Sequence, residues 1–115
     1  MIFFPKNEYL LSKEKIASII ETLPKMLHKR VLHAYIFGSV AKGNFNAQSD
    51  IDILLIIKET TIPFFKRGFE FQDVLDLFTP MDLIIYTEKE FYNKIESSPQ
   101  IGFWGEFIKN NIKLI

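Results

Sequence analysis

The chain has 115 residues, 48% of them hydrophobic and 24% charged, which is typical of one globular domain with its own core. Fourteen basic residues balance 14 acidic ones, which argues against the broad basic surface of a general nucleic-acid-binding protein. The sequence has no cysteine, so disulfides and cysteine-ligated zinc are excluded. We therefore expect a single domain over residues 1–115.

Neither a membrane span nor a secretory signal is expected. The longest apolar run, residues 53–57, is far shorter than a membrane-spanning helix requires. The N-terminal residues lack the charged segment and long apolar stretch of a signal peptide. We expect a cytoplasmic protein with no membrane partner and no direct nucleic-acid partner.

The first half of the chain predicts a helix followed by two strands. Ser12 can cap a helix whose apolar residues recur at helical spacing, and Pro24 should kink or split it. Residues 31–37 are apolar on both alternating faces apart from His33, as in a central strand, and Gly38 ends that strand before a short helical turn. Residues 51–57, with the sequence IDILLII, are the clearest strand.

The second half predicts further helices around a third strand. A helix is expected over residues 63–77, with Gly68 as its weak point, followed by a strand over residues 81–86. Thr87 and Glu90 form a capping box, so a helix should begin directly after this strand. The resulting fold class is α/β (α+β), with a small mixed sheet flanked by helices.

The C-terminal segment predicts one more helix and a short edge strand. Ser98 and Pro99 are typical of a helix start, and Asn110–Asn111 can adopt the left-handed conformation that ends a helix. Residues 112–115 can add a strand at the edge of the sheet. The apolar residues expected to line one side of this helix are Ile101, Trp104 and Ile108.

The first candidate functional residues are two aspartates at the start of the second predicted strand. Asp50 and Asp52 are two residues apart, so their carboxylates point to the same face, while Ile51 and Ile53 point to the other. Two carboxylates this close repel each other unless a cation lies between them, and oxygen ligands suit a hard ion such as Mg²⁺.

Asp82 is the natural third carboxylate, because it is second in the next predicted strand and an apolar run follows it. If the two strands are neighbours, three carboxylates converge at one end of the sheet and can hold two divalent ions, which suits phosphoryl transfer. Asp73 and Asp76 are rivals for the third place, but they fall in a helical pattern where solvent exposure is easier.

The segment before these carboxylates suits phosphate binding. Gly38 allows close approach of the backbone to a phosphate, and Ser39 offers a hydroxyl and a backbone N–H at the start of the short helical turn. Lys42, one helical turn further on, adds a positive charge. The whole would hold a metal-bound nucleotide.

Each of these sequence features has a simpler interpretation when it is taken alone. An isolated D-x-D is often a solvated strand end, and a lysine after a turn is usually solvated. The segment is not a P-loop, because Asn44–Phe45 stands where Lys–Ser/Thr is required after the G-x-x-x-x-G spacing. His28 and His33 are expected to be structural. The combination of glycine–serine, ten intervening residues, D-x-D and a later aspartate is what favours a nucleotide site.

These residues resemble a known family. The sequences GSVAKG (38–43) and SDIDILL (49–55), with Asp82 in a later strand, resemble the minimal nucleotidyltransferase (MNT) branch of the DNA polymerase β-like nucleotidyltransferase superfamily. The resemblance covers essentially the whole chain and implies a palm-like nucleotidyltransferase fold. Lys42 is one departure, since arginine is common at that position in the family and lysine loses its bidentate fork.

The resemblance implies a role for each residue of the site. Asp50 and Asp52 would ligate two Mg²⁺ ions, and Asp82 would ligate the catalytic one and help to activate the attacking hydroxyl. Gly38 and Ser39 would hold the β- and γ-phosphates of ATP. The reaction implied is transfer of AMP from ATP onto a hydroxyl, with release of pyrophosphate.

The resemblance also implies a partner. Larger relatives carry a second domain that helps to hold the acceptor, and we expect none here. Minimal members are typically paired with a helical HEPN protein as antitoxin and toxin, and either AMPylate a tyrosine of that ribonuclease or mask it by binding. The phenylalanine-rich stretches at residues 1–4 and 63–71 are candidate contact surfaces, although core packing explains any single phenylalanine equally well. Neutralisation by binding alone, or a stand-alone or homodimeric enzyme acting on a small molecule, are the alternatives.

Overall fold

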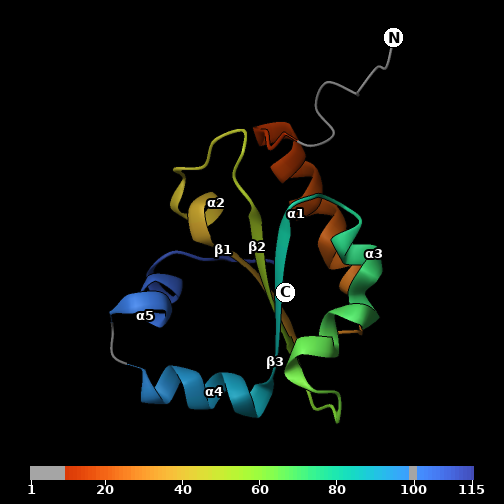
Figure 1. Cartoon of the computed structure of the whole chain (residues 1–115), viewed down its shortest axis with the longest axis vertical. Helices are drawn as coiled ribbons and strands as arrows, with labels where there is room; N and C mark the ends of the chain where they lie inside the picture. The colour runs from red at the N-terminus through yellow and green to blue at the C-terminus, as the bar shows by residue number, and fades with distance from the viewer. Residues whose placement is uncertain (1–9, 99–100) are drawn as a thin grey trace.

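The computed structural model describes residues 10–98 and 101–115. A four-stranded sheet in the order β3-β2-β1-β4 forms the centre (Figure 1). Its strands are β1 (His33–Phe37), β2 (Ile51–Ile57), β3 (Met81–Thr87) and β4 (Ile112–Lys113). Strand β1 is antiparallel to β2 and β4, whereas β2 and β3 are parallel, so the predicted small mixed sheet is confirmed.

Helices cover both faces of the sheet (Figure 1). One face carries α1 (Lys13–Leu27), the 3-10 helix η1 (Phe64–Phe71) and α3 (Gln72–Leu75). The other carries α4 (Glu88–Ser97) and α5 (Gly102–Lys109). The five-residue helix α2 (Gly38–Lys42) directly follows β1. In the described part of the chain no helix combines the length and apolar character that crossing a membrane requires.

The alternation of side chains along β2 divides the core in two. Ile51, Ile53 and Leu55 belong to the larger cluster, which α1 covers. Leu54 and Ile56 point the other way, into a smaller cluster that includes Phe107 of α5 and is rich in aromatic side chains. Asp52 shares the parity of Leu54 and Ile56, so its carboxylate lies at the end of the aromatic face.

The N-terminal helix is confirmed but Pro24 does not split it. The hydroxyl oxygen of Ser12 accepts a hydrogen bond from the backbone N–H of Lys15 at 3.0 Å, so the predicted cap is present. The helix continues through Pro24 to Leu27, because Leu23 and Leu27 are fully buried on either side of it and their packing holds the last turn in place. The first strand begins at His33, two residues later than predicted.

The segment predicted as one helix over residues 63–77 is instead η1 followed by α3. The side chain of Arg67 turns inward from η1 and is only 7% exposed, whereas Phe65 and Phe69 are 78% and 77% exposed. This inward cation and these outward rings do not fit the apolar face of a regular α-helix, which explains the irregular helix around Gly68.

The last helix differs from its prediction at both ends. Helix α5 starts at Gly102 with Ile101 as its N-cap residue, and Ser98 instead ends α4; Pro99 lies outside the described residues. Ile101 and Ile108 are exposed, because the helix buries Phe107 against the sheet. Asn110 has a φ of −132° and is not left-handed, so that prediction is wrong. The capping box of Thr87 and Glu90 and the short edge strand β4 are confirmed.

Candidate active site

The three aspartates singled out in the sequence meet at one end of the sheet. Asp52 and Asp82 are register partners on the parallel strands β2 and β3, and Asp50 immediately precedes β2. One carboxylate oxygen from each residue lies within 4.8 Å of the other two. Asp50 and Asp82 are exposed, and Asp52 is partly buried between them. We call these three residues the acidic triad.

The acidic triad concentrates negative charge. Burial raises the pKa of Asp52 to about 6, and the hydrogen bond to Asp82 and the charges of Asp82 and Asp50 act in the same direction. The fold thus holds a carboxylate where its charged form is disfavoured. Its neighbours in β2, Ile51 and Ile53, are buried apolar residues. Such a cost is typical of a functional site.

The donor set fits a hard divalent cation. All three ligands are carboxylate oxygens, which Mg²⁺ prefers, and neither histidine of the chain belongs to the cluster. A cation among them would offset both the burial and the neighbouring negative charges that raise the pKa of Asp52. The acidic triad could therefore hold the Mg²⁺ ions that the sequence suggests.

Gly38 lies directly against the acidic triad. Its φ is +70°, a conformation that residues with a Cβ atom rarely adopt. A Cβ atom added at Gly38 would overlap Oδ2 of Asp52 and would lie 3.0 Å from the Cγ atom. Because residue 38 has no side chain, the carboxylate of Asp52 can occupy this space. The sequence suggested the glycine for phosphate contact, but its contact with Asp52 follows only from the antiparallel pairing of Phe37 with Asp52.

Lys42 belongs to the same end of the sheet but is paired with α5. Its Nζ atom lies 3.2 Å from Oε2 of Glu106, and both side chains are partly exposed. The Lys42 ammonium group lowers the pKa of Glu106. The two residues, together with Gly38 and Phe103, border a pocket of about 250 Å³. Ser39 follows Gly38 in α2, and α2 ends at Gly43 with a φ of +79°.

Sequence reasoning missed Glu106. The residue is in a different helix, far along the chain from Lys42, and no motif connects the two. Only the packing of α5 beside α2 shows that Lys42 already has a counter-charge.

The rival carboxylates lie outside the site. Asp73 forms an ion pair with Arg30, at 2.7 Å and 3.2 Å from its two carboxylate oxygens. Asp76 accepts a hydrogen bond from the side chain of Gln72 at 2.9 Å. His33 is away from the acidic triad, and its buried Nδ1 atom has no hydrogen-bond partner in the described chain.

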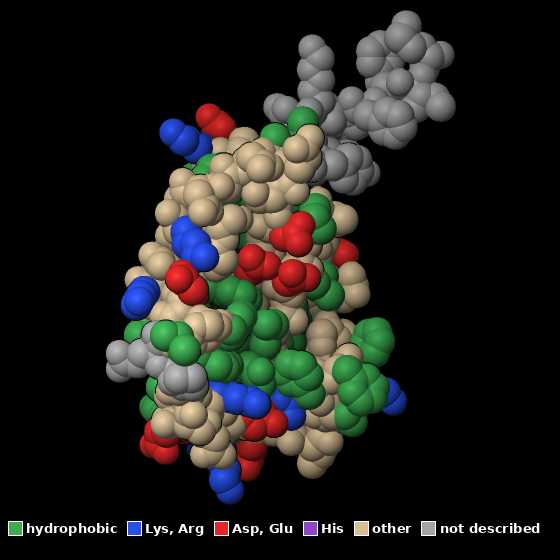
Figure 2. All heavy atoms as spheres, turned by 60° about the vertical axis from the view of Figure 1, so that its left-hand side comes forward, with side chains coloured by type: hydrophobic (Ala, Val, Ile, Leu, Met, Phe, Trp, Pro, Cys, Tyr) green, Lys and Arg blue, Asp and Glu red, His purple; other side chains and the backbone are tan. Residues whose placement is uncertain are grey.

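An apolar surface adjoins the acidic side chains on the face of α4 and α5 (Figure 2). Trp104 lies 5.8 Å from Tyr86 and 4.9 Å from Phe103, centroid to centroid, so the aromatic rings form a continuous group. Phe64 adds a ring 5.2 Å from Tyr86. Of the two phenylalanine-rich stretches, residues 1–4 lie outside the described residues. In the other, Phe71 is buried in the core, while the rest of its rings are exposed.

A mixed sheet that brings three carboxylates together beside a glycine–serine turn is an arrangement that suits metal-bound phosphate groups. The comparison with family models identifies the kind of domain. The model "Polymerase beta, Nucleotidyltransferase" matches residues 14–114. The chain belongs to this nucleotidyltransferase family.

One solved structure agrees with this chain at the level of the fold. A candidate nucleotidyltransferase from Sulfolobus solfataricus, a crystal structure at 1.40 Å, is similar with a TM-score of 0.53 and 24% identity over 70% of this chain and 77% of that chain. A toxin–antitoxin structure with AMP-PNP is similar with a TM-score of 0.47 and 20% identity, over 91% of this chain and 73% of that one. No curated protein matches the sequence significantly.

Proposed function

We propose that this domain is a Mg²⁺-dependent nucleotidyltransferase that transfers AMP from ATP to a hydroxyl group of a partner protein. The observation that carries the proposal is the acidic triad, whose three carboxylate oxygens lie within 4.8 Å at the end of two parallel strands. Membership of the polymerase β nucleotidyltransferase family supports the reaction class.

The proposal gives the glycine–serine turn and the acidic triad different roles. Gly38 and Ser39 would contact the β- and γ-phosphates, and Lys42 would exchange Glu106 for the triphosphate. Asp50, Asp52 and Asp82 would hold two Mg²⁺ ions, which when bound supply positive charge to the phosphates and to the attacking oxygen. This arrangement relies on positioning and electrostatics.

The transfer exchanges one phosphorus–oxygen bond for another. The acceptor hydroxyl oxygen forms a bond to the α-phosphorus, and the bond between that phosphorus and the oxygen bridging to the β-phosphorus breaks. Pyrophosphate leaves with the bonding electron pair. The hydroxyl proton passes to the carboxylate of Asp82, which lies exposed at the edge of the acidic triad.

The acceptor part of the proposal rests on the resemblance to minimal nucleotidyltransferases. It names a tyrosine of a helical HEPN toxin as the acceptor and an antitoxin role for this chain. The triad supports catalysis over neutralisation by contact alone, because a site that has lost its activity has no physical reason to keep three repelling carboxylates together.

The test incubates the protein with ATP, Mg²⁺ and the protein encoded by the adjacent gene, and measures AMP on the partner by intact mass. Asp52→Asn should lose the transfer. Asp76→Asn, which removes a carboxylate outside the site, should keep it. Transfer by Asp52→Asn at the wild-type rate would reject the proposed catalytic site, and neutralisation of the partner without any transfer would support binding alone.

A further inference from the structure

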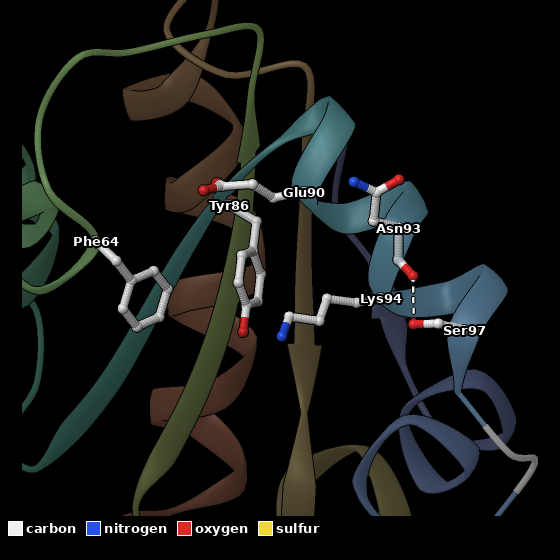
Figure 3. Close-up of a pocket in the computed structure, with 6 residues that line it drawn as sticks. All are labelled: Phe64, Tyr86, Glu90, Asn93, Lys94 and Ser97. Atoms are coloured by element: carbon white, nitrogen blue, oxygen red, sulfur yellow. Dashed lines mark hydrogen bonds between the residues drawn. The ribbon is translucent and has the colours of Figure 1, made fainter.

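A second pocket lies on the same face as the acidic triad, further along β3. Its volume is about 540 Å³. It opens between η1, β3 and α4 (Figure 3). The residues that line it are Phe64, Tyr86, Glu90, Asn93, Lys94 and Ser97. We call it the η1–α4 pocket, and nothing described so far in the transfer reaction uses it.

Arg67 holds Glu90, one of the residues that line this pocket, in place. The guanidinium group donates to the carbonyl oxygens of Ile62 and Ile85 at 3.0 Å each, and to both carboxylate oxygens of Glu90 at 2.6 Å and 3.2 Å. These bonds join three segments of the chain at one buried cation. Glu90 is thereby neutralised, and its carboxylate adds little negative charge to the pocket.

Besides Glu90 and Ser97, the pocket is lined by the rings of Phe64 and Tyr86, the side-chain amide of Asn93 and the ammonium group of Lys94. The rings of Phe64 and Tyr86 form one wall. The ammonium group of Lys94 and the hydroxyl of Tyr86 point toward each other in the pocket (Figure 3). Within residues 10–98 and 101–115, Lys94 belongs to none of the ion pairs. The pocket therefore suits an apolar or aromatic group that carries a carboxylate.

The position of the pocket indicates that it contacts the acceptor and not the nucleotide. Tyr86 lies four residues beyond Asp82 on β3, on the same face of the strand, which is about 13 Å along the sheet. The proposed triphosphate contacts in α2 follow β1, on the other side of β2, so the β3 side is left for the acceptor. Phe65 and Phe69 of η1 are also strongly exposed.

We infer that the η1–α4 pocket binds an acidic peptide segment of the acceptor protein, with an apolar side chain against Phe64 and Tyr86 and a carboxylate at Lys94. This inference rests on the proposed function, because it places the segment so that its hydroxyl reaches the acidic triad. An extended peptide covers about 13 Å in about four residues. The modified hydroxyl is therefore expected about four residues from an acidic residue.

The test compares two charge reversals on α4 in the full-length protein, with the adjacent-gene protein as the acceptor. Lys94 lines the pocket, whereas Lys89 is exposed on the same helix and does not. Lys94→Glu should raise the KM for the acceptor at least about tenfold while changing the KM for ATP less than about twofold. Lys89→Glu should leave both constants near wild type. Mass spectrometry of the modified acceptor locates the hydroxyl and its nearest acidic residue.

Two results would overturn the inference. An unchanged KM for the acceptor in Lys94→Glu would remove the pocket from acceptor binding. A rise in the KM for ATP instead would assign it to the nucleotide. Failure of the proposed function is a separate outcome, seen as no transfer by the wild-type protein. In that case the affinity of the two proteins, measured by calorimetry, still decides: equal affinities of Lys94→Glu and Lys89→Glu would contradict the inference.

Discussion

Replacement of Gly38 by alanine is the most specific perturbation of the site. The added Cβ atom would overlap Oδ2 of Asp52 and lie 3.0 Å from its Cγ atom. Carbon atoms in contact prefer a separation of about 3.5–4.0 Å, so the Cγ atom must retreat by at least about 0.5 Å and the nearer oxygen by about 1 Å. Asp52 is then displaced from Asp50 and Asp82.

The expected loss of activity follows from this displacement. A misplacement of about 1 Å at a catalytic group can cost about 100-fold in rate. Alanine at a φ of +70° also destabilises the fold by about 1–2 kcal/mol. Gly38→Ala should therefore lose about two orders of magnitude in AMP transfer and a modest part of its stability.

Gly43→Ala separates these two effects. Gly43 has a φ of +79°, so it carries a similar backbone cost, but a Cβ atom there would meet nothing within 4 Å. Transfer rates and urea denaturation are measured for both variants. Similar stabilities with a rate loss confined to Gly38→Ala support the reasoning. Equal rates in the two variants, with both folded, would refute the claim that Gly38 leaves room for Asp52.

Three further predictions concern charge. Arg67 lowers the pKa of Glu90 to about 2, so the charged carboxylate stabilises the fold above pH about 4.5 and this stabilisation is lost as the pH falls toward 2. Because the Glu90 side chain is 40% exposed, the contribution is discounted to about 1 kcal/mol. Glu90→Gln should therefore lower the free energy of unfolding by this amount at pH 7 but not near pH 2. An equal difference at both pH values would contradict the assignment. Saturating Mg²⁺ should raise the melting temperature of the wild type by about 5 °C and that of Asp52→Asn by less than about 1 °C, and an equal rise in both would place the metal elsewhere. Glu106→Gln should release Lys42 and lower the KM for ATP by about twofold to threefold, whereas a higher KM would mean that the pair itself helps to bind ATP.

Much of the fold could be predicted because local signals and tertiary packing agree. Residues 51–57 are apolar enough for a central strand, and the structure places β2 over the same residues. The capping box of Thr87 and Glu90 works within four residues, so its sequence signature is sufficient. The apolar spacing did not predict which side of α5 faces the sheet, because tertiary packing determines it. The helix buries Phe107 and leaves Ile101 and Ile108 exposed.

The acidic triad could be predicted only in part. The D-x-D spacing places two carboxylates on one face once the segment is extended as in a β-strand. The third required β2 and β3 to be neighbours, which their parallel register confirms by pairing Asp52 with Asp82. The contact of Gly38 with Asp52 and the counter-charge of Glu106 at Lys42 depend on packing between distant segments, and no local pattern announces them.

The phosphorus atom that reaches the acceptor distinguishes AMP transfer from phosphate transfer. The protein is incubated with Mg²⁺, the adjacent-gene protein and ATP that carries a radiolabel either at the α-phosphorus or at the γ-phosphorus. We expect the α-label to appear on the acceptor, the γ-label to leave in pyrophosphate, and Asp52→Asn to transfer neither. Transfer of the γ-label would make the domain a kinase and overturn the assignment as an AMP transferase. Transfer of the α-label that persists in Asp52→Asn would show that the acidic triad is not the catalytic site.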